Sequence, residues 1–424
     1  MTENDYNFSN LLLYRNLLKD HLIDKLRVLR VLGTAECDEY ALVADLIAWA
    51  EENGIAGNIA ENYLLCQIGY DENIFSITAG KSINLLGSSL EKAAIHDITI
   101  VKAVLKKGLT KQFCKELKTV IDDYHPIKDR TGKKQGKFYD LALLRDLFFD
   151  VTKNYTPQEV VRALGKYYDQ YGCGRLAGYG AFKWDLENRE LVGIEHTDPV
   201  ELQDIIGYEY QKTELVRNTE AFINGKPANN VLLVGARGTG KSSSVKAVAN
   251  RYFDQGLRLI EIAKADFKHI PEIMSILRQW GKSFIIFIDD LSFEESEVEY
   301  KILKSLIDGG VESRPGNVLI YATSNRRNLI KETWDERSGN ELHRQDTINE
   351  KISLADRFGI TLFYTLPNQD EYLQIVGEIA RKNQIFMSED DLRSGALRWE
   401  MTHSGRSGRT AKQFIDYLAG EATN

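Results

Sequence analysis

The sequence predicts an all-helical N-terminal domain, then a parallel α/β domain, then a small helical domain. Two changes in hydrophobic periodicity support this division. Up to about residue 170, apolar side chains recur at three- and four-residue spacing, whereas from about residue 205 short apolar runs alternate with helical stretches. Past Pro367 only helical patterns follow. We therefore expect domains at 1–170, 205–366 and 367–424, with a linker at 171–204.

The composition is that of an ordinary globular protein. Of the 424 residues, 43% are hydrophobic, which excludes a disordered chain. The net charge of −8 argues against a general basic surface for coating DNA, although it does not exclude a local basic patch. Four widely spaced cysteines form no CxxC pair and indicate neither a zinc site nor a disulfide framework. Without a signal peptide or a long apolar span, we expect a cytoplasmic protein that does not enter membranes.

The N-terminal domain is predicted from seven helical patterns. They cover residues 11–32, 39–52, 57–69, 86–107, 110–123, 138–153 and 157–170. The last has a clear start, because Thr156 is a capping residue, Pro157 follows at the first helical position and Glu159 completes a capping box. The basic segment 125–137 is expected to be a solvated loop, with contact to nucleic acid or an acidic partner as the alternative.

The α/β domain is predicted from five short apolar runs separated by helical patterns. The runs are 231–234, 257–262, 284–288, 318–322 and 360–364, and the helical patterns between them lie near 242–255, 270–280 and 295–308. Continuous apolar strands that alternate with helices indicate a five-stranded parallel sheet covered on both faces. Three helical patterns near 369–383, 388–399 and 408–420 then form the last domain.

A phosphate-binding loop follows the first of these strands. The pattern GxxxxGK[ST] is matched in full between a predicted strand and a predicted helix, which is the context of a P-loop NTPase. Glycines allow backbone N–H groups to face an anion, and the helix N-terminus adds partial positive charge. Lys241 can reach the β and γ phosphates and Ser242 can ligate Mg²⁺. The candidate residues are Gly235, Ala236, Arg237, Gly238, Thr239, Gly240, Lys241, Ser242 and the adjacent Ser243.

Polar side chains end two later strands. Asp289 and Asp290 follow the run 284–288, at the edge of a parallel sheet where ligands bind. We expect Asp289 to hold Mg²⁺ through water and Asp290 to polarise the attacking water, with a simple strand-end turn as the alternative. Asn325 follows the next strand and can orient water near the γ-phosphate.

Two arginines are candidates for contacts with the nucleotide. Arg357 precedes the fifth strand and can be an arginine finger that acts in a neighbouring subunit, or a surface charge. Arg409 begins the last helix and can reach the nucleotide from the helical domain. Arg406 is close enough in sequence to be confused with it.

These features, in this order, resemble the AAA+ ATPase superfamily. The loop at 235–242 is similar to Walker A, residues 285–290 to Walker B, Asn325 to sensor 1, Arg357 to the arginine finger and Arg409 to sensor 2. Ile206-Gly207 resembles the box on the adenine side. The amino-acid sequences of these motifs are more similar still to the uncharacterised bacterial AAA+ family filed as domain of unknown function number 815. The resemblance implies a lid formed by the last helical domain, with ATP and Mg²⁺ as cofactors.

The resemblance also implies a homo-oligomer that acts on an unidentified client. AAA+ proteins usually have Glu at the position of Asp290, so Glu294 or Glu295 can be the base instead. A threading unfoldase is not favoured, because residues 263–269 contain no aromatic-hydrophobic-Gly pore-loop motif and Phe267 is the only nearby candidate. Three uses of the nucleotide stay open: remodelling of a protein partner, a nucleotide-gated scaffold with little turnover, and a DNA-associated loader, which the acidic charge disfavours. The segment 326–350 has no assigned role.

Overall fold

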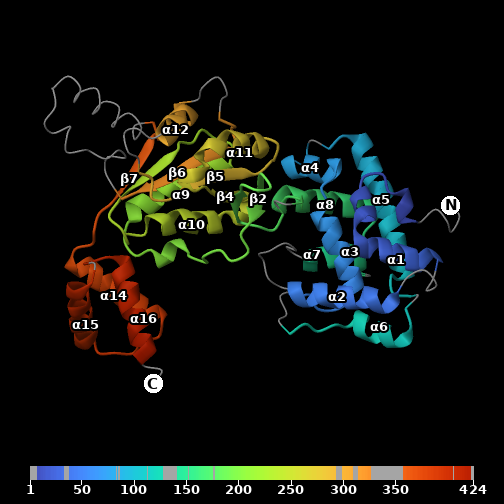
Figure 1. Cartoon of the computed structure of the whole chain (residues 1–424), viewed down its shortest axis with the longest axis horizontal. Coiled ribbons are helices and arrows are strands. Elements are labelled where there is room, and N and C mark those ends of the chain that lie inside the picture. The colour runs from blue at the N-terminus through green and yellow to red at the C-terminus, as the bar shows by residue number, and fades with distance from the viewer. Residues whose placement is uncertain are drawn as a thin grey trace. The chain divides into compact units, whose positions relative to one another are not determined.

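A computed structural model of the chain provides the fold. It describes residues 7–32, 38–82, 84, 86–111, 113–127, 141–150, 152–174, 177–292, 298–308, 314–325, 357–403 and 405–421. The chain forms two compact units, one of Met1–Tyr179 with Trp280–Lys282 and one of Gly180–Gln279 with Ser283–Asn424 (Figure 1). Within the described ranges, no helix combines the length and the apolar character that crossing a bilayer requires.

The first unit is helical, as predicted. Its helices are α1 (His21–Leu32), α2 (Glu39–Asn53), α3 (Ile59–Tyr70), α4 (Ile74–Lys81), α5 (Ser88–Lys107), α6 (Lys115–Asp122), α7 (Leu141–Phe149) and α8 (Pro157–Tyr171). The predicted capping box at the start of α8 is confirmed: the Glu159 N–H donates to Thr156 Oγ1 (3.3 Å), and the Thr156 N–H donates to the Glu159 carboxylate (2.7 Å).

Two details of this unit differ from the prediction. A single helix over 11–32 is wrong, because two short 3₁₀ helices (Phe8–Asn10 and Arg15–Lys19) precede α1. Between them, backbone N–H groups of Leu12, Leu13 and Tyr14 donate to the carboxylate of Asp97 on α5, which holds this stretch out of a helix. The short helix α4 was not predicted.

The second unit contains a seven-stranded sheet rather than a five-stranded one. All five predicted strands are present: β3 (Val231–Gly235), β4 (Leu257–Glu261), β5 (Ser283–Ile288), β6 (Val318–Ser324) and β7 (Ile360–Tyr364). The two further strands, β1 (Ala181–Asp185) and β2 (Glu190–Gly193), come from the expected linker 171–204. The order is β2-β1-β4-β5-β6-β3-β7, and every neighbouring pair is parallel except β1 with β2. The additional strands are a hairpin added along β4, an arrangement that local periodicity does not specify.

Helices lie on both sides of this sheet. In Figure 1, α9 (Glu209–Ile223) and α10 (Lys241–Arg251) lie on one side, and α11 (Ile270–Leu277) and α12 (Val298–Asp308) on the other. The core under α9 and α10 joins Leu215 and Val248 to strand residues such as Leu233 and Phe287. Both faces of the central strands are thereby buried, which explains their continuous apolar sequences.

Three helices complete the second unit and correspond to the predicted lid. They are α14 (Gln369–Lys382), α15 (Glu389–Thr402) and α16 (Gly408–Glu421). Their small core includes Tyr372, Ala396 and Phe414. Gly395 allows the ring of Phe414 to approach α15, since a β-carbon at this position would lie 2.9 Å from the ring.

Candidate active site

The sheet order brings three polar strand ends to one edge. β6 lies between β5 and β3, and all three strands are parallel. The residues that follow them, Asp289-Asp290, Asn325 and the loop after Gly235, therefore meet at the carboxyl edge of the sheet. In doubly wound sheets, this is the edge where ligands bind.

Glycines determine the shape of the loop between β3 and α10. Gly238 and Gly240 have φ angles of 80° and 87°, in the left-handed region that side chains disfavour. Gly235 lies directly against the Tyr364 carbonyl, so any side chain there would collide with the backbone of β7. The backbone can thus curl at the N-terminus of α10, which is the geometry of an anion-binding loop.

Lys241 is the buried cation of this loop. It is 6% exposed, and its ammonium donates to the carbonyls of Gly235 (2.9 Å) and Ala236 (2.8 Å) and to Asn325 Oδ1 (3.0 Å). Burial lowers the pKa of this ammonium, and the carboxylates of Asp289 and Asp290 oppose that effect. All three acceptors are neutral oxygens, so the anionic oxygens of a phosphate would be stronger partners for the same ammonium.

The two carboxylates face different partners. Asp289 Oδ1 accepts hydrogen bonds from Ser242 Oγ (2.6 Å) and Thr323 Oγ1 (2.5 Å). Asp290 Oδ1 accepts from the Asn325 amide (2.5 Å), and its Oδ2 lies 3.6 Å from the Arg237 guanidinium. Both carboxylates are exposed, so a ligand can reach them.

The oxygens of Ser242 and Asp289 suit a magnesium ion. Mg²⁺ prefers oxygen ligands and is usually held by one or two carboxylates together with substrate phosphates, rather than by a cage of protein side chains. One hydroxyl and one carboxylate side by side next to the glycine-rich loop match that donor set. Among the described residues, no group of three or more His, Cys, Asp or Glu side chains offers an alternative metal site.

Comparison with known proteins identifies the family of the chain. The model of the family described as protein of unknown function DUF815 matches residues 177–422. The chain belongs to this family. It is also a member of the AAA+ ATPase superfamily, as the order of its motifs indicated.

Individual relatives match shorter parts of this chain. The replication factor C large subunit of Staphylothermus marinus is 32% identical over 111 residues, 24% of this chain and 26% of the relative. Proteasome-activating nucleotidase 1 of Haloferax volcanii is 25% identical over 169 residues, 33% of this chain and 41% of the relative. The chain thus spans about a quarter to two fifths of the length of these relatives. A solved structure of a Thermotoga maritima RuvB variant has a TM-score of 0.38 at 18% identity, with coverage of 54% of this chain and 67% of that chain.

The predicted adenine-side residues, Ile206 and Gly207, lie between the loop and the lid. A β-carbon at Gly240 would be 3.3 Å from the side chain of Ile205. The next residue, Ile206, packs against the lid core, and Gly207 has a φ angle of 79°. The segment therefore borders the loop on one side and the lid on the other.

The structure also distinguishes the two arginines near the start of α16, Arg406 and Arg409. Arg406 pairs with Glu400 of α15 (2.7 Å) and is thereby held within the lid. The Arg409 N–H donates to the Gly238 carbonyl (3.3 Å), which places Arg409 beside the loop. Arg409 also lowers the pKa of Lys241, in addition to the larger effect of burial.

Arg357 does not join this cluster. It precedes β7, whose residue Ile360 pairs with Val231 at the start of β3, while Tyr364 pairs with Gly235 at the end. A five-residue strand spans about 16 Å, so Arg357 lies near the opposite edge of the sheet from the loop. Glu294, Glu295 and the segment 326–350 lie outside the described residues, as does most of the basic segment 125–137.

Thr323 was not predicted as a site residue. It is 1% exposed near the end of β6, and its hydroxyl contacts both Asp289 and the backbone of Asp290. The run of small polar residues that ends this strand was the available signal, but a sequence does not show which of them turns toward the neighbouring strand.

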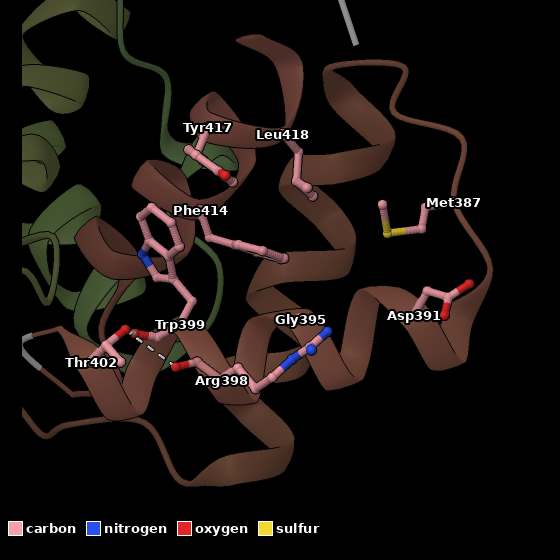
Figure 2. Close-up of a pocket in the computed structure, with 9 residues that line it drawn as sticks. All are labelled: Met387, Asp391, Gly395, Arg398, Trp399, Thr402, Phe414, Tyr417 and Leu418. Carbon is pink, nitrogen blue, oxygen red and sulfur yellow. Dashed lines mark hydrogen bonds between the residues drawn. The ribbon is translucent and has the colours of Figure 1, made fainter. Parts of the chain in front are cut away.

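A separate cavity of about 410 Å³ lies in the lid (Figure 2). Aromatic side chains from α15 and α16, Trp399, Phe414 and Tyr417, form much of its wall, and Asp391 and Arg398 lie at its polar margin. None of the predicted site residues lines this cavity.

Proposed function

We propose that this chain is a cytoplasmic ATPase that binds ATP with Mg²⁺ and hydrolyses it to remodel a protein or nucleoprotein partner. The observation that carries the proposal is the buried ammonium of Lys241 beside the Ser242–Asp289 oxygen pair. That arrangement provides a cation for phosphate oxygens and oxygen ligands for a metal at one edge of the sheet.

Each residue has a defined role in the proposed reaction. Lys241 exchanges its carbonyl partners for the β and γ phosphates, and Ser242 and Asp289 hold Mg²⁺, which neutralises charge on the phosphates. Asp290 accepts a proton from the attacking water while Asn325 orients that water. The water oxygen bonds to the γ phosphorus, the bond to the bridging oxygen breaks, and ADP and phosphate are the products. Arg409 contacts the nucleotide from the lid.

The arginine finger is proposed to act between subunits. Arg357 lies near the opposite sheet edge from its own loop, so it would complete the site of a neighbouring copy in a homo-oligomer. An arginine of this kind contributes about 10³–10⁵ in rate in related phosphoryl transfers, so turnover should depend on assembly. Remodelling by threading through a pore is disfavoured because Phe267 is fully buried.

The central test is ATP binding by the Lys241→Ala variant. Removal of a buried cation that contacts phosphates should weaken binding about 30-fold or more in calorimetry. Lys226→Ala, at an exposed position before β3, is the matched control and should bind like the parent. Equal binding by Lys241→Ala and the parent would show that the phosphate site is elsewhere.

The oligomer proposal has a complementation test. Arg357→Ala should bind ATP but hydrolyse it about 10³-fold or more slowly. Mixing it with Lys241→Ala should restore part of the activity, because an intact arginine would then face an intact loop in some interfaces. If the mixture stays as inactive as its components, Arg357 does not act in a neighbouring subunit.

A nucleotide-gated scaffold with little turnover is the second candidate. It is favoured by Asp290, whose carboxylate is one methylene shorter than glutamate and is engaged by Asn325. Tight ATP binding together with negligible turnover at all protein concentrations, with or without DNA or a client extract, would support the scaffold over the remodelling ATPase.

A further inference from the structure

Thr323 lies at the junction of the strands that form the candidate site. It is 1% exposed on β6 and pairs with Leu233 of β3 in the parallel register. Its side chain reaches the residues that follow β5, on the other side of β6, where it contacts Asp289 and Asp290. A buried hydroxyl in this position can therefore influence both carboxylates.

The hydrogen bonds of this hydroxyl have a defined direction. The Asp290 N–H donates to Thr323 Oγ1 (3.0 Å), so the oxygen acts as an acceptor there. Its single proton is then donated to Asp289 Oδ1 (2.5 Å). Because Ser242 Oγ also donates to Oδ1, both bonds constrain the same oxygen of the Asp289 carboxylate. Thr323 contributes to this orientation from within the sheet, and Ser242 contributes from α10.

Thr323 also stabilises an unusual backbone conformation at Asp290. Asp290 has a φ angle of 53°, in the left-handed region that non-glycine residues rarely adopt. The N–H of Asp290 donates to the Thr323 hydroxyl, and the next N–H, of Leu291, donates to the Thr323 carbonyl (2.7 Å). Thr323 thus holds two successive amides of the turn that directs the Asp290 side chain.

We propose that Thr323 is a positioning residue that orients Asp289 for a divalent cation and holds the left-handed turn at Asp290. This role rests on the proposed binding of ATP and Mg²⁺. This positioning role differs from a purely structural one, because loss of the Thr323 hydroxyl should lower the affinity for the metal more than the affinity for nucleotide alone. Partners that orient metal ligands typically contribute about 10- to 100-fold to metal affinity or activity.

The test uses three substitutions of the full chain. Thr323→Val keeps the shape of the side chain and removes the hydroxyl, while Thr323→Ser keeps the hydroxyl. Thr219→Val is the matched control, because Thr219 is also fully buried in this unit and bonds to Tyr321 (2.8 Å) and the Leu215 carbonyl (2.7 Å), away from the carboxylates. Thr323→Ala replaces the valine variant if that variant does not fold.

Two quantities are measured: ATP affinity without metal, by calorimetry, and Mn²⁺ affinity in the presence of ATP, by electron paramagnetic resonance. Thr323→Val should weaken Mn²⁺ binding about 10- to 100-fold and leave metal-free ATP binding within about twofold of the parent. Thr323→Ser and Thr219→Val should both bind Mn²⁺ like the parent.

Unchanged Mn²⁺ affinity in Thr323→Val would overturn the positioning role while the proposed function stands. Equal losses in Thr323→Ser or in Thr219→Val would also overturn it, because they would trace the effect to packing rather than to this hydroxyl. A parent chain that binds neither ATP nor Mn²⁺ would instead overturn the proposed function and this role with it.

Discussion

Asp97 in the helical unit and Asp289 at the sheet edge both accept several hydrogen bonds, yet they differ in exposure. Asp97 is fully buried and accepts backbone N–H groups from three consecutive residues, Leu12 to Tyr14. Asp289 is exposed and accepts from two hydroxyls beside a buried lysine. A carboxylate that is buried and satisfied by backbone holds a segment in place. One that stays accessible beside a cation and hydroxyl ligands is available for chemistry.

The largest expected effect is on the stability of the helical unit when Asp97 is replaced, and it tests this comparison directly. Asp97→Ala removes the acceptor of three backbone donors: the Tyr14 N–H is buried, and the N–H groups of Leu12 and Leu13 are partly buried. A buried donor left unsatisfied costs about 1–3 kcal/mol, so we expect the helical unit to lose about 2 kcal/mol or more of unfolding free energy, measured by hydrogen exchange of its amides in denaturant. Asp289→Ala should change stability far less while it weakens Mn²⁺ binding. Equal destabilisation by the two variants would remove the distinction.

A smaller effect is expected at the start of α8. Thr156→Ala removes the side-chain cap of this helix and should cost about 1 kcal/mol. Thr156→Ser retains the capping oxygen and is the matched control. Denaturation should detect the loss, and ATP binding should be unaffected because this cap has no role at the sheet edge. A change in ATP affinity would mean that the helical unit's polar groups also serve the site.

The smallest effect is a proton taken up on nucleotide binding. Burial lowers the pKa of Lys241, so at alkaline pH the free protein carries less than a full proton there. A bound triphosphate stabilises the charged ammonium and raises its pKa again, so ATP affinity should fall as pH rises through the lowered value. Calorimetry at alkaline pH in two buffers with different ionisation enthalpies measures the uptake. Lys241→Arg, which does not titrate in this range, should abolish it. Uptake that persists in the arginine variant would assign the proton to another group.

The sequence alone was enough to locate the glycine-rich loop before Lys241 and the five strands around it. Both depend on neighbours within a few residues: the glycines of the loop must curl locally, and a strand buried on both faces must be apolar throughout. The same locality explains why the cap at Thr156 was predicted correctly. The family resemblance was carried by these same short segments.

Tertiary structure decided the features that depend on residues far apart in the chain. The hairpin of β1 and β2 is defined by pairing with β4, and the stretch before α1 is held by Asp97, 85 residues beyond Leu12. Likewise, only the packing of the lid shows that Glu400 engages Arg406 while Arg409 borders the loop. A local pattern specifies which way a backbone can turn, but it does not specify which distant donor meets a given acceptor, and the positions of Thr323 and Asp97 depend on that pairing.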